Sequence, residues 1–145
     1  MSQSDGQAKH RARAAALQML YQCEVGRAGA HESIVSYWAA ENADAELGET
    51  LREFANRLVR GTLDRRDEID GMLSAHAQNW RIERMNVIDR LVLRLAVFEM
   101  LTETDTPSKV IINEAIELAR SFSGDAAVGF VNGVLDAVRK ELRRT

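Results

Sequence analysis

Cysteine is nearly absent from this chain, and its scarcity limits the chemistry open to it. The 145 residues include one cysteine, Cys23, so an internal disulfide is excluded, which fits a reducing compartment. Cys23 falls on the apolar stripe of an expected helix, which favours a buried, inert thiol over a nucleophile. The sequence also lacks an apolar run of the roughly 18 residues that a membrane span needs. Its polar start, MSQSDGQAKH, lacks the apolar core of a secretion signal. We therefore expect a cytoplasmic protein that does not enter a membrane.

Proline and aromatic residues are also scarce. One proline and 6% aromatics argue against an all-β sandwich, whereas alanine, leucine, glutamate and arginine, all good helix formers, dominate the composition. The length suits a single domain with a real core. We therefore predict an all-α protein with one compact helical domain. The net charge of −3 excludes a bulk polycation, so any nucleic-acid binding must be local.

The signatures of catalysis are missing as well. The sequence has no phosphate-binding GxxxxGK[ST] or GxGxxG loop and no GxSxG elbow. His10, His31 and His76 are scattered and lack cysteine partners at metal-ligand spacing. Glu114 and Glu117 lie three residues apart, but a helix-surface pair without a pocket or a histidine is usually solvent-exposed or faces a partner. We therefore expect neither an enzyme nor a bound metal or cofactor.

The chain is organised around the stretch 107–136, which reads as two helices joined by a short glycine-bearing loop. Thr106 can cap the first helix, Pro107 suits its first turn, and Gly124 with Asp125 ends it. Apolar residues at three- and four-residue steps predict the buried stripe of each helix. The first stripe is Ile111, Ala115, Leu118, Ala119 and Phe122; the second is Val131, Val134, Leu135, Val138 and Leu142.

Helix packing does not explain the polar content of the same stretch. The interleaved polar residues are Asn113, Glu114, Glu117, Asn132 and Asp136. Gly129 and Gly133 fall in or beside the second helix, where each costs roughly 1 kcal/mol of helix propensity against alanine. Two interpretations stand equal: the glycines allow close helix–helix approach, or the stretch is a partner surface.

A small basic cluster precedes the first helix. It consists of Lys9, His10, Arg11 and Arg13. Arg13, Leu17 and Tyr21 follow at four-residue steps, which places a guanidinium and a phenol on one flank. Arginine can hold a phosphate and an aromatic ring can stack on an unpaired base, as RNA binding requires. Spacing alone nevertheless favours a solvated helix start with a half-buried tyrosine.

Three further segments of the sequence lead to structural predictions. The acidic run NADAELGE is loop-like and should repel phosphate, so RNA should avoid that end. A stripe from Thr50 to Leu73 forms one long helix or two. The stretch 86–101 is apolar on most sides and predicts a central helix. Its charged exceptions, Arg94 and Glu99, should reach the end of the bundle or pair with a partner.

The motifs INEAIELARSF and FVNGVLD resemble the C-terminal signature of the NusB family of bacterial transcription antitermination factors. VLRLAVFEM (Val92–Met100) and KHRARAAALQMLYQ (Lys9–Gln22) resemble the family's other two blocks, in the same order. The resemblance covers nearly the whole chain. It implies a single domain of about six to seven helices arranged as two packed helical sub-bundles. With it we expect a flexible tail at residues 1–8 and an RNA-binding domain at 9–145.

The resemblance also implies a function and a set of contacts. Family members bind single-stranded boxA RNA through an arginine-rich N-terminus and help RNA polymerase to read through terminators. Matched by position, the implied RNA contacts are Lys9, Arg11, Arg13 and Tyr21, and Arg94 is added because its block lies near the family's RNA surface. Phe130 could stack on a base and Asn132 could hydrogen-bond to a base edge, with a capping or core role for each equally open. His10 completes the basic cluster. His10 stands where another arginine is common, and a neutral histidine would remove one phosphate contact.

The implied partners are boxA RNA, the small-subunit ribosomal protein NusE and the RNA polymerase antitermination complex. Glu114, Glu117 and Asp125 are the candidates for contacts with NusE. The alternative function is a helical scaffold or dimerisation module without RNA binding, and the exposed glycines of the second signature helix would suit a homodimer.

Overall fold

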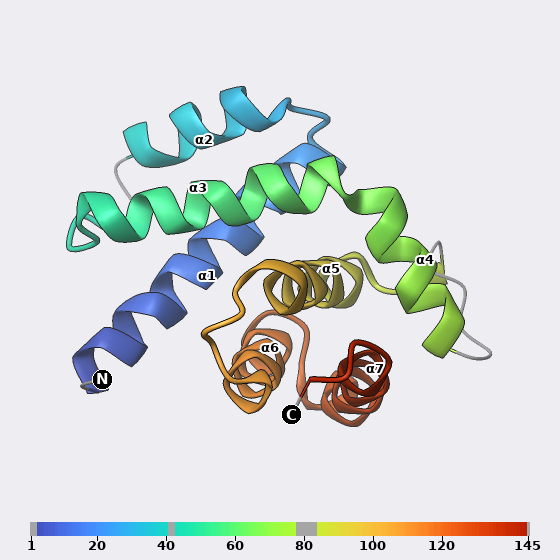
Figure 1. Ribbon diagram of the computed structural model, residues 1–145. Helices are drawn as coiled ribbons and strands as arrows, with labels where there is room; N and C mark the ends of the chain where they lie inside the picture. The colour runs from blue at the N-terminus through green and yellow to red at the C-terminus, as the bar shows by residue number, and fades with distance from the viewer. Residues whose placement is uncertain (1–2, 41–42, 78–83, 145) are drawn as a thin grey trace. The chain divides into compact units, whose positions relative to one another are not determined.

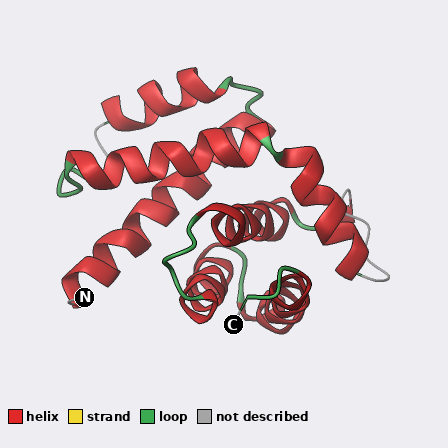
Figure 2. Cartoon of the chain, viewed as in Figure 1, coloured by secondary structure: helices red, strands yellow, loops and turns green. Residues whose placement is uncertain are grey.

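The protein is built from α-helices, as the composition predicted. The computed structural model describes residues 3–40, 43–77 and 84–144, with backbone only for 3–5. Figures 1 and 2 show helices joined by short loops, and no strand occurs within these ranges. The helices are α1 (Gln3–Val25), α2 (Ala30–Ala39), α3 (Glu49–Asp64), α4 (Arg66–His76), α5 (Val87–Thr102), α6 (Ser108–Phe122) and α7 (Val128–Glu141). A short 3-10 turn, η2 (Asp125–Ala127), precedes α7.

The chain divides into two compact units, residues 1–63 and 64–145. The first holds α1 to α3 and the second holds α4 to α7, which matches the two helical sub-bundles expected from the resemblance. Among the described residues, no helix is both long enough and apolar enough to span a membrane.

Helix α1 is the longest element of the first unit and starts earlier than expected. It begins at Gln3, so most of the segment assigned to a flexible tail is helical; the flexibility of these first turns stays a prediction, and residues 1–2 lie outside the described ranges. The helix ends at Val25, directly before Gly26. Its Cys23 is half-buried and donates from Sγ to Ser33 Oγ of α2 at 3.3 Å, so the thiol has a structural partner.

The apolar stripe from Thr50 to Leu73 forms two helices. Helix α3 ends at Asp64, α4 begins at Arg66, and Arg65 between them leaves helical geometry with φ −106° and ψ 19°. The polar run around Arg65 thus marks a break in the helix. Helix α3 is joined to α2 by a hydrogen bond from Trp38 Nε1 to Asn56 Oδ1 at 2.8 Å.

Helix α5 is the core of the second unit, as its apolar circumference predicted. Every residue from Leu91 to Met100 is buried, including the charged Arg94 and Glu99. Asn86 caps the helix, because its Oδ1 accepts a hydrogen bond from the Ile88 backbone N–H at 2.8 Å. In Figure 1, α5, α6 and α7 are seen nearly end-on as one group.

Helices α6 and α7 confirm most of the predicted signature pair. Pro107, not Thr106, is the N-cap residue of α6, and no side chain caps that end. Gly124 ends the pair's first helix with φ 128°, a backbone conformation that residues with a Cβ rarely adopt. The predicted stripes are buried, except that Phe122 is 43% exposed and Leu142 is half-buried.

The two glycines of α7 do not mediate close helix packing. Both Gly129 and Gly133 are exposed, and a Cβ added to either would meet no atom within 4 Å. Of the two interpretations of these glycines, close helix–helix approach is therefore wrong within the described chain. The partner-surface interpretation stays a prediction.

Candidate nucleic-acid interface

The basic cluster at the start of α1 is organised by an aromatic ring from α3. Phe54 is 6% exposed, and three cations approach its face: Lys9 Nζ at 5.5 Å, Arg13 Cζ at 5.6 Å and Arg57 Cζ at 5.4 Å from the ring centroid. The negative face of an aromatic ring attracts cations at such distances. The ring thus gathers positive charge from two helices of the first unit at one place.

Arg13 belongs to the interior of this cluster. Its exposed fraction is 2%, so its guanidinium is not offered to solvent, and this corrects the expectation that Arg13 contacts a phosphate directly. Leu17 and Tyr21, on the same flank, are buried and half-buried. The four-residue spacing therefore marks the inward face of α1. Arg13 adds positive electrostatic potential and packs beneath the surface cations.

Arg57 is a cation near this ring that the implied RNA contacts did not include. It is exposed and lies over Phe54, which Lys9 also approaches. The spacing of Phe54 and Arg57 on one helix was a weak signal. Their proximity to Lys9 depends on tertiary packing, which a single sequence does not reveal.

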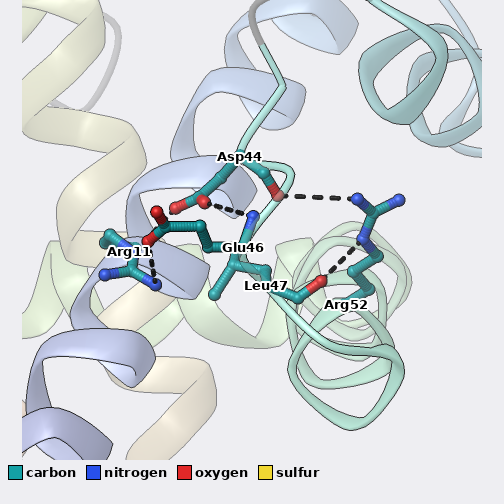
Figure 3. A network of polar contacts seen from close by, with 5 residues as sticks. All are labelled: Arg11, Asp44, Glu46, Leu47 and Arg52. Atoms are coloured by element: carbon teal, nitrogen blue, oxygen red, sulfur yellow. Dashed lines mark hydrogen bonds and ion pairs between the residues drawn. The ribbon is translucent and has the colours of Figure 1, made fainter.

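Arg11 of α1 has a partly exposed guanidinium, and an acidic loop faces it (Figure 3). Its Nε lies 2.7 Å from Asp44 Oδ2, and its second terminal nitrogen lies 3.9 Å from Glu46 Oε2. The Arg11 side chain keeps 41% exposure, against 25% for Asp44 and 85% for Glu46. The two carboxylates therefore occupy positions that a phosphate would take.

The acidic loop is held in place by its own contacts. Asp44 Oδ1 accepts the Glu46 backbone N–H at 3.1 Å, and Leu47 is 2% exposed. Arg52 of α3 donates from Nε to the Leu47 carbonyl at 3.0 Å and stacks 4.6 Å from the Trp38 ring centroid. Figure 3 shows Arg52 on the side of the loop away from Arg11. The loop is thus a built element that presents its carboxylates to α1.

The acidic segment, which RNA is expected to avoid, lies against the basic start of α1. Asp44 and Glu46 contact Arg11 within the first unit. Arg11 and Asp44 are more than thirty residues apart in the sequence. Their contact therefore becomes visible only in the folded protein.

The remaining residues of the implied RNA set differ in how far their side chains are exposed to solvent. Lys9, His10 and Phe130 are half-buried, and Asn132 is exposed on α7. Arg94 is not a surface contact: its exposed fraction is 7%, and it donates from Nε and a terminal nitrogen to the two Asp70 carboxylate oxygens at 2.7 and 2.9 Å. This bidentate ion pair joins α5 to α4. Arg94 therefore has a structural role, as the pairing alternative predicted.

Two of the implied partner residues, Glu117 and Asp125, lie near the C-terminal end of α6. Glu117 pairs with Arg120, whose Nε lies 3.3 Å from Asp125 Oδ1. Glu117 is 54% and Asp125 88% exposed at the side chain, so the structure brings these two acids together around one arginine. Glu114 is half-buried on the same helix. Within the described chain, no group of three or more histidine, cysteine or acidic residues could hold a metal ion.

Comparison with known proteins identifies the chain's relatives. The model of the NusB family matches residues 10–140. The transcription antitermination protein NusB of Myxococcus xanthus is 42% identical over 94% of this chain and 98% of its own length. The T. maritima NusB structure superimposes with a TM-score of 0.80 at 37% identity, covering 92% of this chain and 91% of that one. A crystal structure of the antitermination factors NusB and NusE with double-stranded RNA matches the fold, with a TM-score of 0.82 at 24% identity over 93% of this chain and 98% of that one.

Proposed function

Because the chain belongs to the NusB family, we propose that it is a transcription antitermination factor that binds boxA-type single-stranded RNA. It acts in the cytoplasm on nascent transcripts, notably ribosomal RNA, and helps RNA polymerase to read through terminators. Its activity is binding without covalent chemistry. The name that its relatives carry, transcription antitermination protein, supports this proposal.

The observation that carries the RNA-binding proposal is the cation cluster around Phe54. Lys9 and Arg57 approach the ring, and Arg11, which also lies on α1, keeps 41% of its side chain exposed. Positive charge concentrated at one place on a chain of net charge −3 favours a local contact with phosphates. We assign the phosphate contacts to Lys9, Arg11 and Arg57. His10, Tyr21, Phe130 and Asn132 remain candidates for base contacts.

The protein partner in this proposal is NusE. A relative of the same fold forms a complex named for NusB and NusE together with RNA, which supports a joint assembly. The exposed Glu117 and Asp125 offer negative charge at the end of α6, and a basic patch on a partner would complement it. Glu114 lies on the same helix and completes the candidate contacts.

The test is binding of a fluorescent boxA-type RNA, followed by anisotropy, with and without NusE. We expect saturable binding that NusE tightens, because two surfaces then hold one RNA. A scrambled RNA of the same length is the control for non-specific charge. Sedimentation of the protein alone distinguishes the scaffold alternative: a chain that dimerises yet binds neither RNA nor NusE would contradict the proposal.

A further inference from the structure

A groove lies between α6 and α7 of the second unit. Its volume is about 340 Å³, at the lower end of the roughly 300–1,000 Å³ typical of small-ligand sites. Its lining residues are Lys109, Ile112, Asn113, Asn132, Asp136 and Arg139. Three of the polar residues that helix packing left unexplained in the signature stretch, Asn113, Asn132 and Asp136, therefore line one feature of the surface.

The polar groups of the groove fall into two sets. Asp136 and Arg139 are committed to each other, since Arg139 donates from Nε and a terminal nitrogen to Asp136 Oδ1 at 3.0 and 2.8 Å. Lys109, Asn113 and Asn132 are exposed, and their side chains make no hydrogen bond or ion pair with another described residue. One ammonium and two amides are thus available to a ligand.

These available groups match the chemistry of a nucleotide. An asparagine amide pairs with base edges through one donor and one acceptor, and a lysine holds a phosphate as a point charge. Asp136 also pairs with Lys140 at 3.2 Å, so its charge is balanced and opposes phosphate little. A protein-binding hot spot would instead need a central aromatic or large apolar anchor, and Ile112 is the sole apolar lining residue.

We propose that this groove binds one nucleotide of a single-stranded RNA, with Asn113 and Asn132 on the base and Lys109 on a phosphate. The inference rests on the proposed RNA-binding function and adds a subsite in the second unit. It assigns a ligand role to Lys109 and Asn113, which neither composition nor the resemblance singled out as RNA contacts. The site would read the base, whereas the cluster around Phe54 reads phosphate charge.

The experiment uses the full chain, boxA-type RNA and three substitutions. Lys109→Gln is compared with Arg66→Gln, which removes one positive charge from an exposed position of α4 in the same unit. We expect Lys109→Gln to reduce the log–log salt slope by roughly 0.7 relative to the control, the value for one lost single-strand phosphate contact. The double variant Asn113→Ala/Asn132→Ala should weaken binding about tenfold, the loss of one good base contact. Both asparagines are exposed, and thermal unfolding verifies that the variants fold.

Side-chain amide signals in a nitrogen-15 NMR spectrum provide the direct readout. Those of Asn113 and Asn132 should shift when boxA-type RNA is added and stay in place when NusE alone is added. If they move with NusE and not with RNA, the groove binds protein and the inference is wrong. If wild-type protein binds RNA and Arg11→Gln weakens binding while the groove variants match Arg66→Gln, the inference fails and the proposed function stands. A wild-type chain that binds no RNA overturns both.

Discussion

The charge of Arg11 is partly balanced within the free protein. Asp44 and Glu46 lie at 2.7 and 3.9 Å from its guanidinium, so an incoming phosphate competes with carboxylates of the same chain. This competition lowers the affinity for any polyanion that contacts Arg11. Because the competition involves single side chains, a single substitution can test it.

Asp44→Asn should therefore strengthen RNA binding. Exposed ion pairs are worth about 0.2–1 kcal/mol, so releasing Arg11 should lower the Kd by up to about fivefold. Anisotropy titration with boxA-type RNA measures the change. Glu32→Gln, an equal change of charge at an exposed site on α2, is the matched control. A Kd that changes equally in both variants would mean that Asp44 acts through net charge alone.

Asp136 gives a pH-dependent prediction at the same scale. Hydrogen bonds from Arg139, and then from Lys140, hold the pKa of Asp136 below its ordinary 3.8. A carboxylate with a lowered folded-state pKa stabilises the protein above its unfolded pKa of about 3.9, and this contribution is lost as pH falls through the folded pKa. Asp136→Asn should thus lower Tm at neutral pH and narrow its difference from wild type below about pH 4. Thermal unfolding between pH 7 and 3 checks this; parallel profiles for the two proteins would contradict it.

At the scale of helices, the second unit depends on a charge pair that crosses its core. Arg94 of α5 is 8% exposed at the side chain and holds Asp70 of α4 with two hydrogen bonds. Removing one partner of a buried pair strands the other charge, which costs about 3–5 kcal/mol when burial is complete. Because Asp70 keeps 25% exposure, the cost here should fall below that range.

Asp70→Ala should therefore destabilise the protein by about 2–3 kcal/mol, and urea unfolding measures the shift of the midpoint. Glu68→Gln is the control on the same helix, because it breaks an exposed pair with Arg65. That control should leave the midpoint nearly unchanged. Equal midpoints for the two variants would show that the α4–α5 pair carries no stability.

The start of α5 offers an independent test of local structure. Asn86→Ala removes the side-chain acceptor of the Ile88 backbone N–H and should cost about 1 kcal/mol of stability. Asn86→Asp, which keeps an acceptor at the helix N-terminus, should retain wild-type stability. Urea unfolding of both variants decides; an alanine variant as stable as wild type would mean that solvent satisfies this N–H equally well.

The helices themselves could be predicted from the sequence more fully than their contacts. Periodic apolar residues identified the central helix α5 and the signature pair, and Gly124 marked the end of α6. The break at Arg65 stayed open because the apolar stripe continues through it. Capping of α6 by Thr106 was wrong because the N-cap position falls at Pro107.

The candidate site was predicted only in part, since it depends on pairings between distant segments. The basic residues of α1 were found from local composition. The burial of Arg13, the cation Arg57 and the opposed acidic loop all follow from packing around Phe54 and Leu47. Residues that match a family by position can therefore have a structural role, as Arg94 shows with Asp70.

For the whole molecule, the proposed function requires an acidic helical chain to bind a polyanion through a few local cations. Net charge of −3 repels RNA at long range, so binding requires short-range contacts from Lys9, Arg11 and Arg57. Salt should weaken these contacts in proportion to the number of phosphates they neutralise. The salt dependence of RNA affinity therefore measures how many phosphate contacts the protein makes.

The most direct measurement is the log–log slope of boxA-type RNA affinity against salt concentration, for wild type, Arg11→Gln and the charge-matched Arg66→Gln. The phosphate contacts of Lys9, Arg11 and Arg57 together predict a slope of roughly −2, and the contact proposed for Lys109 would make it roughly −3. Arg66→Gln should match wild type, and Arg11→Gln should be less steep by roughly 0.7. Identical slopes for all three proteins would contradict the phosphate contact of Arg11, and a wild-type slope near zero would contradict RNA binding by the cations of the first unit.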